Sequence, residues 1–255
     1  MSSPQTLLQE ILGKGGLSTL FQPIMEIGAG LHELFAVEAL SRGQKGTNAE
    51  RADVLFDYVR RKGKEIEVDR ACTAAALSAA AANGIGCPLS INVHASTLER
   101  DEQWVEFLAG ACARRGLPLS HVILEIVEQQ KFWDERRFFQ TLDQLRTAGV
   151  RIALADIGLG YSNYRMLIEI RPEFFEIDPY FVTGCGERAP ARAAIESISL
   201  LAGRLGGRVI ARGVESESDL RTLEALGIRL MQGYYLGSPD VEPPRAAELA
   251  QQEMS

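Results

Sequence analysis

The stretch RIALADIGLG, residues 151–160, decides the fold predicted for this chain. Its apolar residues 152–154 predict a short buried strand that ends on the carboxylate of Asp156 and runs into a loop with two glycines. A buried parallel strand followed by a turn into a helix is common in α/β proteins. In a (β/α)8 barrel, the carboxyl ends of the strands carry the functional groups. The interpretation of Asp156 therefore depends on whether the other strands also end on polar residues.

The rest of the chain alternates between strand and helix patterns. Residues 17–27 and 33–40 predict two strands, which must be antiparallel because the turn at 28–30 is so short. Later strands are predicted at 89–93, 122–127, 152–155, 174–177, 209–211 and 228–234. Helices are predicted at 50–61, 65–82, 102–115, 135–148, 163–170, 191–205 and 217–226. This order predicts an α/β fold, a modified TIM (β/α)8 barrel with an antiparallel first strand.

The length of 255 residues fits a single barrel domain, which is typically ~250 residues long. We expect a leader helix and loop at 1–16 and one barrel domain at 17–250, standing alone without a sensory domain. The first residues lack a basic region followed by a long apolar run, and no segment is apolar enough to cross a membrane. These features predict a cytoplasmic protein without a membrane partner.

Charge and cysteine content argue against two further classes of protein. The net charge of -7, without a basic stripe, argues against binding to a nucleic-acid backbone. An anionic ligand would have to be held by a few placed arginines or by a metal ion. The cysteines Cys72, Cys87, Cys112 and Cys185 form no C-x-x-C pair. They predict buried thiols in a reducing compartment rather than a disulfide framework.

Polar residues stand at or just beyond the ends of the second to eighth predicted strands. In chain order they are Glu38, Arg42, Asn92, Glu125, Glu128, Asp156, Glu176, Asp178, Arg212, Glu215 and Gln232. A polar residue at a strand end usually caps a helix or faces water, which is the better interpretation of Glu128, Asp178 and Glu215 taken singly. The carboxyl ends of the parallel strands of a barrel lie at the same end, which we call the mouth. The set as a whole therefore predicts that these side chains converge at the mouth. Carboxylate and amide oxygens without cysteine suit Mg²⁺ or Mn²⁺.

Eight short motifs resemble one family in order and spacing. They are FQPI, EALSR, INV, LEIVE, ADIGLGYS, EID, ARGVE and QGY, which begin at residues 21, 38, 91, 124, 155, 176, 211 and 232. This pattern resembles the EAL domain, the bacterial cyclic di-GMP phosphodiesterase family, over nearly the whole chain. The resemblance implies a barrel with an antiparallel first strand and a role in bacterial signal transduction.

In that family two metal ions activate a water that attacks one phosphodiester of cyclic di-GMP. The resemblance implies that Glu38, Asn92, Glu125 and Asp156 match metal ligands, and that Glu38, Glu125 and Asp156 match catalytic residues. Arg42 matches an arginine that grips a phosphate. The full set expected to bind cyclic di-GMP is Gln22, Glu38, Leu40, Arg42, Asn92, Asp156, Glu215, Gln232 and Gly233. The loop at 158–163 resembles a segment that couples the site to a dimer interface, which implies a homodimer.

Three positions depart from the family pattern. Ala155 replaces the first of two consecutive aspartates, Glu176 replaces a lysine, and Arg212 replaces a glutamate. An alanine cannot bind a metal, and an arginine cannot be deprotonated to do so. Metal binding lowers the pKa of water from ~15.7 to about 7, whereas a lone general base contributes only ~10²–10⁴-fold. We therefore expect weak or absent Mg²⁺ or Mn²⁺ binding and impaired catalysis.

Two of these changes reverse charge at adjacent strand ends. We predict that Glu176 and Arg212 form an ion pair in part of the former metal site; the alternative is independent drift after catalysis was lost. Breaking a buried ion pair costs ~3–5 kcal/mol, which favours the pair if both side chains point inward.

Three functions remain open at this point. The first is a degenerate EAL domain that binds cyclic di-GMP as a sensor or regulatory module without cutting it. The second is a weakly active phosphodiesterase that depends on Mg²⁺ or Mn²⁺, and the third is a protein-interaction module that no longer binds nucleotide. Arg42 favours the first over the third, because a purely structural barrel does not require an arginine there. A protein partner would then supply input or output.

Overall fold

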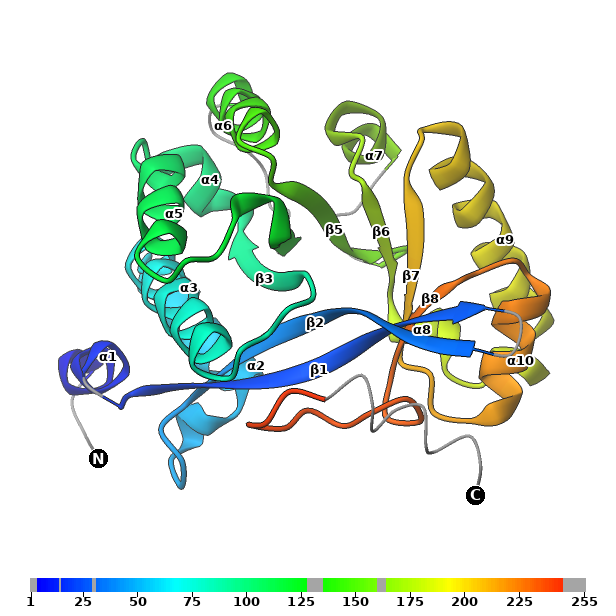
Figure 1. Ribbon diagram of the computed structural model, residues 1–255, viewed down its shortest axis with the longest axis horizontal. Helices are drawn as coiled ribbons and strands as arrows, with labels where there is room; N and C mark the ends of the chain where they lie inside the picture. Colours follow the sequence, from blue (N-terminus) through cyan, green and yellow to red (C-terminus); the bar gives the residue numbers. More distant parts are fainter. Residues whose placement is uncertain (1–3, 14, 29–30, 128–134, 160–163, 245–255) are drawn as a thin grey trace.

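The computed structural model describes residues 4–13, 15–28, 31–127, 135–159 and 164–244. Within them eight strands close into a barrel whose strand order follows the chain (Figure 1). The strands are β1 (Leu17–Gly28), β2 (Leu31–Gly43), β3 (Leu89–His94), β4 (Val122–Val127), β5 (Arg151–Ile157), β6 (Phe174–Ile177), β7 (Arg208–Arg212) and β8 (Leu230–Gln232). β1 is antiparallel to both β2 and β8, and the other neighbouring strands are parallel. The predicted modified TIM barrel is confirmed.

Helices cover the outside of the barrel (Figure 1). They are α1 (Pro4–Leu12), α2 (Ala52–Arg61), α3 (Glu65–Ala82), α4 (Ala95–Arg100), α5 (Trp104–Ala113), α6 (Glu135–Thr147), α7 (Tyr164–Ile170), α8 (Pro179–Val182), α9 (Ala189–Arg204) and α10 (Glu217–Ala225). The sequence did not predict α4 or α8, because six and four residues are too few to show a helical apolar period. The Asp178 side chain accepts a hydrogen bond from the Tyr180 backbone N–H, 2.7 Å away, and so caps α8. The capping interpretation of Asp178 is confirmed.

β1 and β2 form a long ribbon, and the chain after β8 returns beside it (Figure 1). Phe21 and Asp240 exchange two backbone hydrogen bonds, of 2.6 and 3.0 Å. This return holds the segment after β8 against β1, next to the residues that the sequence places at the barrel mouth.

Alternate residues of the strands point into the barrel and form layers. One layer is apolar and consists of Ile24, Ala36, Ile123, Ala153, Phe174, Ile210 and Leu230. Two residues further along the parallel strands, the inward positions are Glu38, Glu125, Ala155, Glu176, Arg212 and Gln232. One strand period thus separates an apolar layer from a charged one, which places the charged layer at the carboxyl end of the barrel.

Neither disulfides nor membrane spans contribute to the fold of the described residues. All four cysteines are free thiols, and Cys72, Cys112 and Cys185 are buried while Cys87 is half-buried. None of the helices in the described ranges combines the length and the apolar character needed to cross a membrane.

Candidate functional site

A cavity of about 590 Å³ opens at the barrel mouth. Residues from five strands and from α2 and α3 line it: Glu38, Leu40, Ser41, Arg42, Ala52, Asp53, Phe56, Arg60, Asp69, Cys72, Asn92, His94, Glu125, Val127, Asp156 and Arg212. The cavity thus brings together seven residues singled out from the sequence, namely Glu38, Leu40, Arg42, Asn92, Glu125, Asp156 and Arg212.

Glu38 joins two of the predicted amides. Its carboxylate is only 1% exposed and accepts one hydrogen bond from Asn92 Nδ2 and one from Gln232 Nε2, both 2.8 Å long. Gln22 is the register partner of Glu38 across β1 and β2, but its Nε2 donates to the backbone oxygen of Gly237 at 3.1 Å. The structure therefore brings Glu38, Asn92 and Gln232 into contact and places Gln22 beside them.

Arg212 lies among four carboxylates, which we call the carboxylate cluster: Glu38, Glu125, Glu176 and Asp156. Its Nη1 lies 3.0 Å from Glu125 Oε1, 3.3 Å from Glu176 Oε2 and 4.0 Å from Asp156 Oδ1. Its Nη2 lies 3.6 Å from Glu38 Oε2. The predicted ion pair between Glu176 and Arg212 is confirmed, and Arg212 also contacts the three other carboxylates.

Burial and mutual repulsion change how the carboxylate cluster titrates. Burial, with the charges of Glu176 and Glu38, raises the pKa of Glu125 well above its usual value. Burial also raises the pKa of Glu176 to about 7, although the Arg212 charge opposes this. Burial alone would lower the pKa of Arg212, but the surrounding carboxylates raise it overall, so the guanidinium stays charged. Glu125 and Glu176 therefore retain protons at pH values where isolated glutamates have lost them.

Asp156 and Ala155 lie at an irregularity of β5. Asp156 has a φ of +54°, and the pairing of β5 with β6 shifts register between Leu154 and Ile157. Aspartate is one of the few residue types that adopt this left-handed conformation readily. Ala155 is 1% exposed, whereas the Asp156 side chain is 56% exposed. The irregularity therefore turns Asp156 to the rim and leaves the inward position to a methyl group.

The residues as arranged do not fit a divalent metal ion. Asn92 turns its amide N–H toward Glu38, and Arg212 contacts the Oε1 atom of Glu125, which a metal would need. In the part of the chain that the structure describes, no group of three or more His, Cys, Asp or Glu side chains is arranged to hold a metal. Mg²⁺ and Mn²⁺ require several oxygen ligands directed at one point, which this arrangement does not offer.

Two further arginines, Arg42 and Arg60, line the mouth. Arg42 is half-buried, and its Nη1 donates to the backbone oxygen of Ser41 at 2.9 Å. Arg60 of α2 also lines the cavity and lies 3.7 Å from Asp57. The ring of Phe56 is part of the same wall. These groups give the mouth cations and an aromatic surface.

Two other predicted positions, Glu215 and Gly233, have different surroundings. Glu215 is exposed in the loop after β7, and the contacts of the described residues do not connect it to the carboxylate cluster. Gly233 is buried, and a Cβ there would lie 2.1 Å from the backbone oxygen of Val214, so this glycine permits close backbone packing. Glu128 and residues 160–163 of the predicted coupling loop lie outside the described residues.

Sequence reasoning missed His94 and Asp69. The Asp69 carboxylate accepts hydrogen bonds from the His94 backbone N–H (2.9 Å) and from Thr97 Oγ1 (2.6 Å), and it lies 2.7 Å from His94 Nδ1. His94 also packs on Phe56, with ring centroids 5.6 Å apart. His94 follows Asn92 by two residues on β3, so the period of the strand could have placed both at the mouth.

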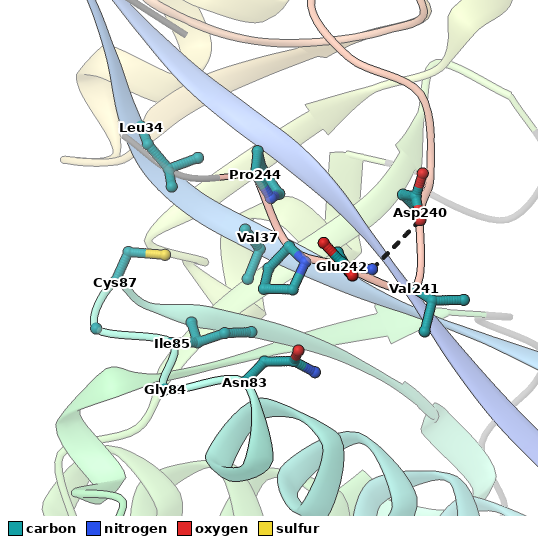
Figure 2. A pocket seen from close by; sticks show the side chains of 12 residues that line it. Leu34, Val37, Asn83, Gly84, Ile85, Cys87, Asp240, Val241, Glu242 and Pro244 are labelled. Carbon is teal, nitrogen blue, oxygen red and sulfur yellow. Dashed lines mark hydrogen bonds between the residues drawn. The ribbon is translucent and has the colours of Figure 1, made fainter. Parts of the chain in front are cut away.

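A second cavity, of about 950 Å³, lies between β2, the segment 83–87 and the segment 240–244. Figure 2 shows Leu34, Val37, Ile85 and Cys87 along it, with the Glu242 backbone N–H donating to Asp240. None of the predicted site residues lines it. Functional pockets combine apolar walls with converging polar groups, and the barrel mouth matches that description better.

Comparisons with known proteins place the chain in a family. A family model, the EAL domain, matches residues 5–239. The probable cyclic di-GMP phosphodiesterase PdeA of Escherichia coli is 35% identical over 118 residues, which are 46% of this chain and 16% of that protein. The cyclic di-GMP-bound structure of a standalone EAL protein from Vibrio cholerae has a TM-score of 0.80 and 25% identity, covering 91% of this chain and 97% of that one.

A complex of Klebsiella pneumoniae BlrP1 with manganese and cyclic di-GMP has a TM-score of 0.78 and 25% identity, over 88% of this chain and 56% of that one. The chain spans less than a third of the length of the curated relatives it matches first, so the activities of those whole proteins do not transfer directly. The family match itself includes every strand of the barrel. The chain therefore belongs to the EAL domain family.

Proposed function

We propose that this EAL domain binds cyclic di-GMP at the barrel mouth and hydrolyses it poorly or not at all. The observation that carries the proposal is the position of Arg212, which contacts Glu38, Glu125 and Glu176 in the charged layer of the barrel. Relatives with the same fold are named for binding or cutting this nucleotide, which supports the choice of ligand. Here a guanidinium lies among the carboxylates that hydrolysis would use.

Binding needs cations for two phosphates, and two arginines of the mouth that do not belong to the carboxylate cluster supply them. Arg42 and Arg60 line the cavity, whereas the cluster has four carboxylates for one guanidinium. Phosphates are repelled by the cluster and attracted by the two arginines. Phe56 provides a surface on which a guanine base can stack. We therefore assign phosphate binding to Arg42 and Arg60.

Hydrolysis needs more than the side chains at the mouth supply. Enzymes accelerate such reactions by ~10⁶–10¹⁷-fold, whereas general acid–base catalysis contributes ~10²–10⁴-fold. The carboxyl groups of Glu125 and Glu176 can hold or release a proton, but Ala155 contributes no ligand and Arg212 stays charged. We therefore propose that hydrolysis is impaired. Because we assign phosphate binding to arginines, we also propose that nucleotide binding does not require Mg²⁺ or Mn²⁺.

A second candidate function is weak phosphodiesterase activity dependent on Mg²⁺ or Mn²⁺. It is favoured by one observation, the convergence of Glu38, Asn92, Glu125 and Asp156 on the same cavity. These four side chains are the ligands that the family resemblance implies. These four side chains could hold a metal only after Arg212 had been displaced. Metal-dependent phosphodiesterase activity is therefore the less favoured function.

The proposal also covers the cellular location, the partners and the bounds of the domain. We propose that it is cytoplasmic and that a homodimer or a protein partner carries its output. We also propose that the barrel domain extends over residues 17–250.

Calorimetric titration of the purified protein with cyclic di-GMP tests this proposal, first in EDTA and then in Mn²⁺, with recovery of the nucleotide. We expect saturable binding in EDTA, weakened by Arg42→Ala, and intact nucleotide afterwards. The matched control is Arg208→Ala, which removes an arginine at the opposite end of β7, where it pairs with Glu26 at 2.6 Å. Linear product formed rapidly in Mn²⁺ would establish the phosphodiesterase instead. Absence of binding in both conditions would leave the protein-interaction module.

A further inference from the structure

The carboxylate cluster contains three glutamates that are almost completely buried. Glu38, Glu125 and Glu176 are between 1% and 2% exposed, and Arg212 is the cation that contacts all three. We infer that Arg212 is the resident cation of this site: its guanidinium holds the position between the glutamates that a divalent ion would need and so keeps the site free of metal. This inference deepens the proposed function, but it does not depend on whether nucleotide binds.

The distances make a guanidinium and a metal ion mutually exclusive. Arg212 Nη1 is 3.0 Å from Glu125 Oε1 and 3.3 Å from Glu176 Oε2, so it occupies the space between these two oxygens. An Mg²⁺ ion would have to lie about 2.0–2.1 Å from each oxygen that it binds. A dication at that position would overlap or closely approach a positive charge, and the repulsion is strong where water is excluded.

The strand register holds Arg212 in place. In the β6–β7 ladder Glu176 is paired with Ile210, and Arg212 lies two residues further along on the same face. The inward direction of both side chains therefore follows from the pleat of the sheet. Arginine, unlike lysine, does not lose its proton in proteins, so it cannot leave the carboxylates by becoming neutral.

The three buried glutamates of the cluster have hydrogen-bond partners without a metal. Glu38 accepts from Asn92 and Gln232, and Glu125 accepts from Arg212 and, at 3.4 Å, from Ser90 Oγ. The buried side-chain atoms that lack a partner in the described part of the chain all lie elsewhere, and none belongs to Glu38, Glu125 or Glu176. In a metal site without its ion, the ligating oxygens would lack a partner, because the ion that they bind is absent.

Titration with Mn²⁺ alone, without nucleotide, tests the inference by calorimetry and by electron paramagnetic resonance of free Mn²⁺. We expect no saturable binding by the wild-type protein at millimolar Mn²⁺. Arg212→Gln should bind Mn²⁺ saturably, about 10- to 100-fold more tightly than the millimolar limit set by the wild type, which is the range over which neighbouring groups change metal affinity. The matched control Arg208→Ala removes an equal charge from the other end of β7 and should behave as wild type.

Removal of Arg212 leaves buried carboxylates without their cation, and the single variant can fail to fold for this reason. A second variant keeps the test valid in that case. Arg212→Gln combined with Glu176→Gln removes one charge of each sign, and Mn²⁺ should raise the melting temperature of this variant but not of the wild type. Equal Mn²⁺ binding by wild type and both variants would overturn the inference. That result would leave the EDTA titration with cyclic di-GMP unaffected, so the two proposals can fail separately.

Discussion

Arg212 and Glu176 are joined across adjacent strands, with Arg212 Nη1 3.3 Å from Glu176 Oε2. Their contact is diagonal, because the register pairs Glu176 with Ile210 rather than with Arg212. A slip of one residue would turn every side chain of the strand to the opposite face, so the fold itself specifies this contact. The register therefore directs both side chains to the inside of the barrel, where they meet.

The first prediction concerns the contribution of Arg212 to stability. Arg212→Ala should lower the free energy of unfolding by about 3–5 kcal/mol, because it leaves Glu125 and Glu176 buried without a cation. Arg208→Ala breaks an exposed ion pair on the same strand and should cost about 1 kcal/mol or less. Urea unfolding measures both values. Equal losses for the two variants would mean that Arg212 does not stabilise the buried carboxylates.

The second prediction concerns pH. Burial raises the pKa of Glu176 from its usual 4.5 to about 7, so between these values the folded protein holds a proton that the unfolded chain has released. The stability contributed by this group should therefore fall as the pH rises from 4.5 to 7 and stay constant above. Urea unfolding in EDTA, compared between wild type and Glu176→Gln, isolates the effect. A difference between the two proteins that stays constant across this range would contradict the prediction.

The third prediction concerns thiol reactivity. Burial raises the pKa of Cys72 to about 12, and burial together with the Asp219 charge raises that of Cys185 to about 11. Burial also raises the pKa of Cys87 and of Cys112. Thiolates are the reactive form, so the native protein should react with Ellman's reagent at pH 8 far more slowly than the urea-unfolded protein. Rapid modification of a buried thiol in the native state would show local opening of the barrel.

The sequence predicted the barrel and much of the site because both follow from strand period. Glu38, Glu125 and Arg212 each stand two residues after a buried apolar residue of the same strand, so alternation directs them into one layer. The charge reversal at Glu176 and Arg212 then predicted a contact, since adjacent strands carry the two residues.

Other parts of the site depend on tertiary structure that strand period does not encode. The period could have placed His94 at the mouth, but not its partner Asp69, because α3 shows no clear apolar face from which to choose the side that meets the barrel. The register shift beside Asp156 was also not predictable, because one left-handed residue leaves the apolar pattern of the strand unchanged.

The fourth prediction concerns the backbone at Asp156, at the centre of the stretch that decides the fold. Its φ of +54° is tolerated by aspartate, asparagine and glycine but is strained for a β-branched residue. Asp156→Val should therefore lower the free energy of unfolding by about 1–2 kcal/mol, whereas Asp156→Asn should stay close to wild type. Urea unfolding of the two variants separates backbone strain from the loss of the carboxylate, which both share. Equal destabilisation by valine and asparagine would mean that the contact of the carboxylate with Arg212, and not the left-handed backbone, is what the fold requires of this residue.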